Sequence, residues 1–266
     1  MRRYSRRLGL TNMIAKTPED YKNLRAAGNI LSGILDDLVG LVREGGNAAE
    51  LDLAAEERLK ARGAVSAFFG YQPQGAPYPY PGTICISIND EVVHGLPSQD
   101  KMFRQGDVVK IDCGLSFNGY FVDGLRTVCV GEGDKNARRL ITATREALDS
   151  GIGAARVGVH IGDIGAAIKR VAVKYRLGIA EDLGGHGVGK SLHEPPYIAN
   201  DGNPGEGEVL VEGQVIAIEP IFCEGKGGIK LAPDGWTYVT RDRSRSAEAE
   251  ATIIVGKNGA EILTRY

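Results

Sequence analysis

Hydrophobic residues follow a helical period at the start of the chain. The run Thr17-Pro18-Glu19-Asp20 is typical of a helix start, with a capping threonine and a proline at the first helical position, and apolar residues then recur at helical spacing. We expect this helix to end at Gly45-Gly46. A second helix is predicted to begin at Asn47, where Glu50 completes a capping box, and to run to Gly63.

The pattern then changes to short strand-like runs. From Ala64 to Gly131, β-rich runs alternate with clusters of Gly, Pro, Asn and Asp, which predicts an antiparallel sheet region. Two further helices are expected at 134–152 and 162–178, and strands return in VIAIEPIF, WTYVT and ATIIVG. The order is therefore helix pair, strands, helix pair, strands.

This order indicates an internal duplication, which one local match supports. The segments GDVVKID (106–112) and GQVIAIE (213–219) both run from a glycine through strand-forming residues to an acid. Chance similarity between two short strands is the alternative. Related halves would place the two acids at corresponding positions around a pseudo-two-fold axis. Because no linker separates the halves, we expect a short N-terminal arm over 1–16 and a single domain over 17–266.

Composition narrows the class of partner. The 32 basic and 34 acidic residues give a net charge of -2, so no overall field favours nucleic acid or an anionic membrane. No apolar run approaches the roughly 20 residues of a membrane-spanning helix, and the basic start lacks the apolar run of a secretory signal. We expect a cytoplasmic monomer. Its four scattered cysteines are expected to be buried free thiols: Cys85, Cys113, Cys129 and Cys223.

Four acids follow or adjoin apolar strand segments: Asp112, Asp123, Glu219 and Glu250. Burying an ionised carboxylate without a partner costs roughly several kcal/mol, and neighbouring carboxylates repel one another. The nearest basic residues in sequence are few and are expected at turns or strand edges. A pair of divalent cations would balance the four charges, with His186 as a neutral fifth ligand. This ligand set suits Mn, Fe or Co more than a structural zinc. The alternative is that Asp112 and Asp123 lie in turns and are solvated, which explains either acid alone equally well.

The stretch GGHGVGKSLHEPP (184–196) has two interpretations. Its first eight residues fit the G-x-x-x-x-G-K-S spacing of a phosphate-binding loop, yet the same glycine-rich segment displays His186 and His193. A phosphate-binding loop must open a helix, and Pro195-Pro196 follow too soon after Lys190 for one to start. We therefore interpret the glycines as residues that let the backbone turn tightly around His186.

Six segments together resemble a known family: SINDEVVHG, KIDCG, YFVDG, GHGVGKSLHEPP, IEPIF and DGWTYVTRDRSRSAEAEAT. In order and separation they closely resemble a type I methionine aminopeptidase of the pita-bread fold. The resemblance implies an α+β fold of two pseudo-two-fold-related halves that form one curved antiparallel sheet with helices on its outer face. It also implies a dimetal hydrolase that removes the initiator methionine from nascent polypeptides by metal-hydroxide attack on the first peptide bond.

The resemblance also assigns individual residues. It implies two divalent ions, Co, Mn, Fe or Zn, held by Asp112, Asp123, His186, Glu219 and Glu250. His94 would contact the scissile peptide, His193 would stabilise the tetrahedral intermediate, and Glu219 would transfer the proton. The pocket for the methionine side chain would be lined by Tyr80, Cys85, Leu192 and Trp236.

The chain departs from the family at several positions. The family motif Gln-x-Glu-His-Thr is replaced by Glu-Ala-Glu-Ala-Thr at 248–252, and by strand alternation Glu248 should face the site with Glu250 while Ala251 faces away. Leu192 replaces a more usual aromatic residue. The loop at 72–82 is longer than expected, so Tyr78 is an equal candidate for the position given to Tyr80, and a surface loop without contacts is the alternative.

Two other functions stay open. One is an aminopeptidase of related fold with shifted specificity, such as the proline-specific enzymes, which usually carry a large N-terminal domain. The other is a non-catalytic pita-bread module that binds a protein partner; such proteins typically lose metal ligands, and all five positions are retained here. The basic residues of the arm suit transient ribosome contact, but a solvated tail is the favoured interpretation for Arg2, Arg3, Arg6 and Arg7.

Overall fold

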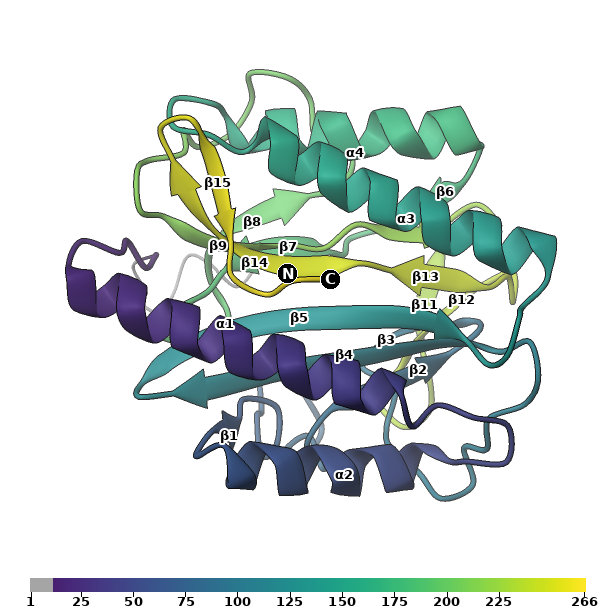
Figure 1. The fold of residues 1–266 in the computed structure, drawn as a ribbon. Helices are drawn as coiled ribbons and strands as arrows, with labels where there is room; N and C mark the ends of the chain where they lie inside the picture. Colours follow the sequence, from purple (N-terminus) through teal and green to yellow (C-terminus); the bar gives the residue numbers. More distant parts are fainter. Residues whose placement is uncertain (1–11) are drawn as a thin grey trace.

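The computed structural model describes residues 12–266 and contains helices and strands in the expected order (Figure 1). The helices come in two pairs, each followed by strands. They are α1 (Pro18–Val39), α2 (Ala48–Ala61), α3 (Lys135–Ala154) and α4 (Ile161–Tyr175). All strand pairs of the described chain are antiparallel, which confirms the α+β class.

The main sheet has nine strands. Its path is β1 (Val65–Ser66), β4 (Val108–Phe117), β5 (Tyr120–Cys129), β14 (Glu250–Gly256), β9 (Val215–Ile218), β7 (Gly184–Gly187) and β8 (Glu194–Ala199); β2 (Cys85–Ile88) pairs with β4, and β15 (Gly259–Ile262) pairs with β14. One smaller sheet contains β13 (Ser246–Glu248), β10 (Ile221–Cys223) and β6 (Gly178–Ile179). The other contains β11 (Ile229–Leu231), β12 (Tyr238–Thr240) and β3 (Glu91–Val93).

The two halves of the molecule meet where β5 pairs with β14. The first duplicated segment forms β4, which lies beside β5, and the second forms β9, which lies beside β14. Figure 1 shows the helix pair α1 and α2 on one side of these central strands and the pair α3 and α4 on the other. The duplicated segments thus take corresponding places about the β5–β14 pair, as the pseudo-two-fold prediction requires.

Each helix pair buries its apolar stripe against its own half of the sheet. In the first half, Leu31 of α1 packs in one core with Ile111 of β4. In the second half, Ile168 of α4 packs in a separate core with Ile253 of β14. Each such fully buried side chain contributes roughly 1.5–3 kcal/mol to folding. The opposite face of the central strands is thereby left free to carry polar side chains.

The first helix begins as predicted and ends earlier than predicted. Thr17 caps α1 by accepting from the Asp20 N–H, and the Asp20 carboxylate accepts from the Thr17 N–H at 2.9 Å. The helix ends at Val39 instead of Gly45-Gly46, because the N–H groups of Leu41 and Val42 donate three residues back in the tighter geometry common at helix ends.

Part of the expected arm is packed and not solvated. Met13 and Ala15 are buried, and Ile14 forms a bridge with Gln214. The Val215 N–H donates to the Met13 carbonyl oxygen at 3.0 Å, so this segment is hydrogen-bonded to the start of β9. The arginines of the predicted tail lie outside the described residues: Arg2, Arg3, Arg6 and Arg7.

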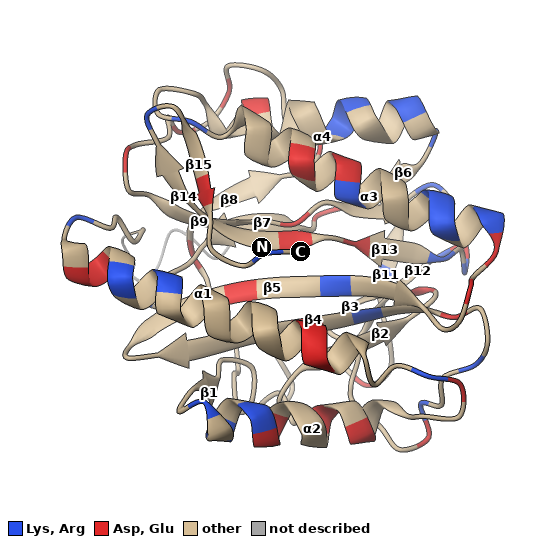
Figure 2. Cartoon of the chain, viewed as in Figure 1, with Lys and Arg blue, Asp and Glu red and all other residues tan. Residues whose placement is uncertain are grey.

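Each of the long helices carries charge of both signs. Figure 2 shows basic and acidic residues on α1, α2, α3 and α4. Within residues 12–266, no helix combines the length and the apolar character that crossing a bilayer would require. The four cysteines are free thiols, as expected, and three of them are buried.

Candidate metal centre

Five consecutive neighbours in the main sheet each bring one predicted ligand to the same place. The order is Asp112 on β4, Asp123 on β5, Glu250 at the start of β14, Glu219 directly after β9, and His186 on β7. Because hydrogen-bonded strands lie about 4.8 Å apart, ligands on successive strands are brought within reach of one another. The strand order therefore assembles residues that are far apart in the sequence.

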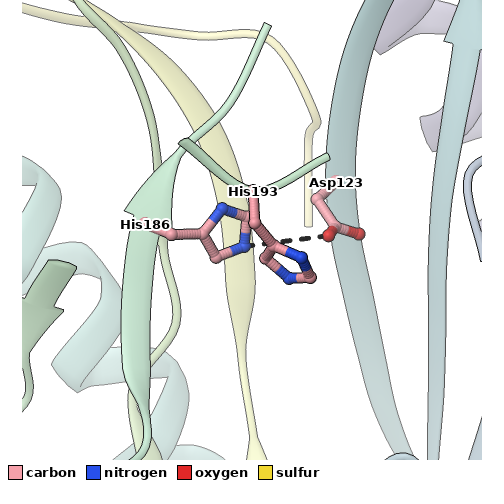
Figure 3. A group of neighbouring side chains, drawn as sticks. All are labelled: Asp123, His186 and His193. Carbon is pink, nitrogen blue, oxygen red and sulfur yellow. Dashed lines mark ion pairs between the residues drawn. The ribbon is translucent and has the colours of Figure 1, made fainter. Parts of the chain in front are cut away.

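The five side chains converge on one cluster. The His186 Nε2 atom lies 3.8 Å from Asp123 Oδ2 and 3.8 Å from Glu219 Oε1. Ligand atoms of Asp112, Asp123 and Glu250 lie within 4.8 Å of one another, and so do those of His186, Glu219 and Glu250. A third group at the same spacing joins His193 to Asp123 and His186, as Figure 3 shows.

The electrostatics of the cluster fit divalent cations. Burial raises the pKa of Asp123 to about 8 and, with repulsion from neighbouring carboxylates, the pKa values of Asp112 and Glu250 well above their usual range. Burial lowers the pKa of His186 to about 4, which keeps the imidazole neutral and able to bind a metal. The Asp112 Oδ1 atom is buried without a hydrogen-bond partner among the described residues. Such oxygen-rich sites with one imidazole suit Mn, Fe or Co.

Two residues outside the predicted ligand set fix Asp123. The Thr252 hydroxyl accepts from the Asp123 N–H at 2.9 Å and donates to its carbonyl oxygen at 2.8 Å. Gly114 pairs with Asp123 across β4 and β5, and a Cβ atom there would lie 3.2 Å from Asp123 Oδ1 and 2.7 Å from the Phe68 ring. Position 114 therefore requires glycine, because any side chain there would collide with Asp123 and Phe68.

One basic side chain lies beside the acids, contrary to the expectation of turns and strand edges. Lys110 is 1% exposed, and its Nζ donates to the carbonyl oxygens of Ser246 at 3.0 Å and Asn89 at 3.3 Å. Burial lowers the pKa of Lys110 to about 8, while nearby acids, including Glu248, raise it. Alternation along β4 places Lys110 on the same face as Asp112, and two backbone carbonyls solvate its ammonium group.

The predicted orientation of Glu248 is confirmed. Glu248 is buried and shares a side-chain hydrogen bond with Glu219, whereas Ala251 is buried in the second apolar core. Burial raises the pKa of Glu248 to about 7, although the hydrogen bond with Glu219 and the charge of Lys110 lower it. This chain therefore places a further carboxylate against the predicted ligand Glu219.

Replacing Glu248 by glutamine should weaken binding of divalent cations by about tenfold at pH 8. The amide keeps the shape of the side chain but removes a negative charge beside the cations. With a pKa of about 7 in the metal-free protein, the wild-type carboxyl must lose a proton to attract the cation at lower pH. The difference should therefore grow as the pH rises through 7 and level off above about pH 8. Calorimetric titration with Mn²⁺ measures it, and Glu261→Gln, which removes a surface partner of Arg25, is the matched control.

The glycine-rich stretch forms two strands joined by a turn, β7 and β8. Lys190 lies in the turn and no helix follows, which excludes a phosphate-binding loop. The prediction of a tight turn around His186 is wrong for most of these glycines, since Cβ atoms at Gly185 and Gly187 would lie 2.3 Å and 2.0 Å from carbonyl oxygens of facing strands. Glycine is needed there because the neighbouring backbones approach closely, and only Gly189 in this stretch has a positive φ, 138°.

The turn between β7 and β8 is held by Glu194, a role that no pattern in the sequence indicates. Its buried carboxylate accepts from the backbone N–H groups of Lys190 at 2.6 Å, Ser191 at 2.8 Å and Met13 at 2.6 Å. The turn carries Leu192 and His193, so Glu194 fixes two predicted site residues through the backbone.

Of the two predicted catalytic histidines, His193 lies beside the predicted ligand His186, and His94 lies close to His193. The ring centroids of His186 and His193 are 4.5 Å apart, and His193 Nδ1 lies 2.8 Å from the hydroxyl of Tyr71. Burial, then the charges of His186 and His94, lower the pKa of His193 well below its usual value. Burial lowers the pKa of His94 to about 4, and its backbone adopts a left-handed φ of 58°. Strained backbone of this kind is concentrated at functional sites.

The four residues predicted to line the methionine pocket form a buried apolar cluster together with Phe68. Cys85 pairs with Asp112 across β2 and β4, so the cluster adjoins the metal ligands. Tyr80 is 2% exposed, and its hydroxyl donates to the Gly95 carbonyl oxygen at 2.8 Å. Phe68 supplies an aromatic ring close to Leu192, because both would contact a Cβ at Gly114.

Tyr78, the alternative to Tyr80, lies outside this cluster. It is 37% exposed and its hydroxyl donates to the Asp234 carbonyl oxygen at 2.7 Å. Its ring lies 6.5 Å from that of Trp236, edge to face. The long loop therefore does make contacts, which argues against a free surface loop, and it brings Tyr80 instead of Tyr78 into the cluster.

Comparison with known proteins agrees with this geometry. The model of metallopeptidase family M24 matches residues 22–257. A methionine aminopeptidase of Clostridium acetobutylicum is 38% identical over 95% of this chain and 98% of its own length. The crystal structure of a methionine aminopeptidase from Thermotoga maritima has a TM-score of 0.90 at 38% identity, covering 96% of this chain and all of its own.

A prolidase from Pyrococcus furiosus is less similar, with a TM-score of 0.73 at 26% identity. The match covers 95% of this chain but 66% of that enzyme, so the prolidase shares the fold and has a further part that finds no counterpart here. The methionine aminopeptidases, by contrast, match this chain over nearly their full lengths. The chain therefore belongs to metallopeptidase family M24, within its group of methionine aminopeptidases.

Proposed function

We propose that this protein releases the N-terminal methionine from peptides and nascent chains, as a monomer with two divalent ions bound. The observation that carries the proposal is the contact between two sites. The cluster of Asp112, Asp123, His186, Glu219 and Glu250 directly adjoins the apolar cluster around Tyr80 and Trp236. A hydrolytic centre beside a cluster of buried apolar side chains suits removal of an apolar N-terminal residue.

The ligand set accounts for two ions. With two divalent cations bound, Lys110 completes the balance of charge against the four ligand carboxylates and Glu248. When bound, such ions polarise a carbonyl group and lower the pKa of water toward neutrality. Co, Mn, Fe and Zn all suit the donor atoms, and titration of each ion into metal-free protein identifies the preferred one.

The chain's own residues supply the remaining chemistry. Glu219 borders the centre and shares a hydrogen bond with Glu248, so its carboxylate can take the proton that water loses and pass it to the leaving amine. His193 lies at the centre as a neutral imidazole and donates a hydrogen bond to the oxygen of the scissile carbonyl. His94, close to both His193 and Trp236, contacts the peptide bond being cleaved.

The test is release of free methionine from Met-Ala and Met-Gly peptides by protein reconstituted with Mn²⁺, Fe²⁺, Co²⁺ or Zn²⁺. We expect release from these peptides and none from N-acetylated Met-Ala, because an exopeptidase requires the free amino group. An absence of released methionine in all four metals, in protein that calorimetry shows to bind them, would contradict the proposal and favour a binding module.

A second function is favoured only by the shared fold of the prolidase. It is tested in the same assay with Ala-Pro dipeptides and with Met-Pro peptides. Faster cleavage of Ala-Pro than of Met-Ala would assign the chain to the proline-specific group. We expect Met-Ala to be preferred, because Tyr80, Leu192 and Trp236 offer an apolar surface of the kind that a methionine side chain contacts.

A further inference from the structure

We propose that Tyr71 is a positioning residue that holds His193 in the tautomer whose Nε2 carries the proton. This arrangement makes His193 a hydrogen-bond donor at the centre and keeps it out of the metal coordination sphere. The inference rests on the proposed function, because it explains how His193 performs the role given to it there. It concerns a residue that no motif of the sequence singled out.

The contact between the two side chains is direct. The Tyr71 hydroxyl oxygen lies 2.8 Å from His193 Nδ1, and the two rings lie 5.3 Å apart at an angle of 51°. A hydroxyl group and a neutral imidazole at this distance form a strong hydrogen bond. Tyr71 lies in the loop between β1 and β2, and His193 lies in the turn between β7 and β8. The contact therefore joins two segments that are 122 positions apart in the sequence.

The chemistry of the two groups favours one direction of this hydrogen bond. Above about pH 7.5 an imidazole is mostly neutral and carries a single proton. A neutral imidazole has one donor nitrogen and one acceptor nitrogen, and a phenol is a good donor that is ionised only near pH 10. When the phenol donates to Nδ1, the single proton of the ring must lie on Nε2.

The tautomer decides between two roles that the geometry allows. His193 lies within 4.8 Å of Asp123 and His186 as a possible metal-binding group, and Figure 3 shows its ring beside the pair formed by these two side chains. Metal binding through Nε2 requires a free lone pair there, whereas stabilisation of a developing oxyanion requires an N–H. A donor on Nδ1 excludes the first role and supplies the second.

Tyr71 is itself held in place on both sides. Its N–H donates to the Phe68 carbonyl oxygen at 2.9 Å, and its own carbonyl oxygen accepts from the Tyr80 N–H at 2.9 Å. The Gly70 N–H closes the base of the loop by donating to the Tyr80 carbonyl oxygen at 2.9 Å. Because Phe68 and Tyr80 are buried in the apolar cluster, the hydroxyl is aimed from a fixed base.

The first test observes the tautomer itself. The chain has only four histidines, so the ring nitrogens of ¹⁵N-labelled full-length protein give a small set of NMR signals. In protein loaded with Zn²⁺, which is diamagnetic, we expect His193 to have a protonated Nε2 and a bare Nδ1, assigned by comparison with His193→Ala. In Tyr71→Phe the ring should become a mixture of tautomers or bind zinc through Nε2. A protonated Nδ1 in the wild-type protein would overturn the inference.

The second test is kinetic. Tyr71→Phe should lower kcat for Met-Ala cleavage by about tenfold, the effect of one hydrogen bond, with KM changed by less than about twofold. In a His193→Ala background the same change should have no further effect, because Tyr71 acts through His193. The matched control is Tyr175→Phe, which loses a hydroxyl hydrogen bond of 2.7 Å to Glu146 and should keep wild-type kcat.

The outcomes separate this inference from the proposed function. If His193→Ala lowers kcat while Tyr71→Phe does not, the positioning role is wrong and the proposed function stands. If His193→Ala leaves kcat unchanged, the donor role proposed for His193 is wrong. If Tyr71→Phe lowers kcat equally in both backgrounds, Tyr71 acts on the substrate or on folding and not through His193. Thermal denaturation of each variant shows whether folding is affected.

Discussion

Asp123→Asn is expected to abolish tight binding of divalent cations and to lower methionine release by roughly a thousandfold. Asp123 belongs to two of the three groups of converging ligand atoms, so its loss affects both ends of the cluster. An amide oxygen is a neutral and weaker ligand than a carboxylate oxygen. The substitution keeps the shape of the side chain, whose Oδ1 accepts from the Gly124 N–H at 3.0 Å.

Calorimetric titration with Mn²⁺ or Co²⁺ and the Met-Ala assay measure this result. The matched control is Asp37→Asn, which alters an acid of α1 that pairs with Arg62 on the surface. We expect the control to bind metal and release methionine as the wild-type protein does. Wild-type metal affinity in Asp123→Asn would show that the converging acids are not the metal site.

Metal-free protein is expected to lose stability as the pH rises from about 6.5 to about 8. Burial raises the pKa of Glu248 to about 7 and of Asp123 to about 8, and those of Asp112, Glu219 and Glu250 well above their usual range. The folded state thus keeps protons that an unfolded carboxyl, with a pKa near about 4, has lost. Stability falls with pH wherever the folded state holds more protons, by about 1.4 kcal/mol per pH unit for each proton.

The other buried groups fix the pH window. His94 and His186, with pKa values of about 4, oppose the carboxyls only below about pH 6.5, where an unfolded histidine binds a proton. Lys110, with a pKa of about 8, opposes them only above that value, because its folded pKa is lowered. Between about pH 6.5 and 8, therefore, the stability changes with pH only through the buried carboxyls. Their contribution to the stability of the folded state is lost as they ionise.

Thermal denaturation in the presence of a chelator measures this effect. For a chain of this size, each kcal/mol lost lowers the Tm by roughly 2–4 °C. Saturating Mn²⁺ should reverse the loss, because ligand binding stabilises the folded state and cancels the repulsion. At pH 8 the metal-free Asp123→Asn variant should melt above the metal-free wild-type protein. A wild-type Tm that is constant or rises over this range would contradict the expected burial of these acids.

The local elements and the candidate ligands follow from the sequence. Thr17 and Asn47 predict the starts of α1 and α2, because a capping side chain bonds to backbone only a few residues away. The acids at the ends of GDVVKID and GQVIAIE predict two related ligand positions, since a repeated strand pattern implies a repeated environment. The position of Glu248 beside Glu250 follows from alternation, although Ala249 separates the strands that carry them.

The contacts between distant segments follow only from the tertiary structure. The role of Lys110 depends on the carbonyl groups of Asn89 and Ser246, that of Glu194 on N–H groups as distant as Met13, and that of Tyr71 on His193. The glycines of β7 are explained by facing backbone, which no local pattern reveals. Sequence determined which residues are candidates for the chemistry, because residue type and local period are local properties. Tertiary structure decided which groups hold and neutralise them, because those partners meet only when the strands pair.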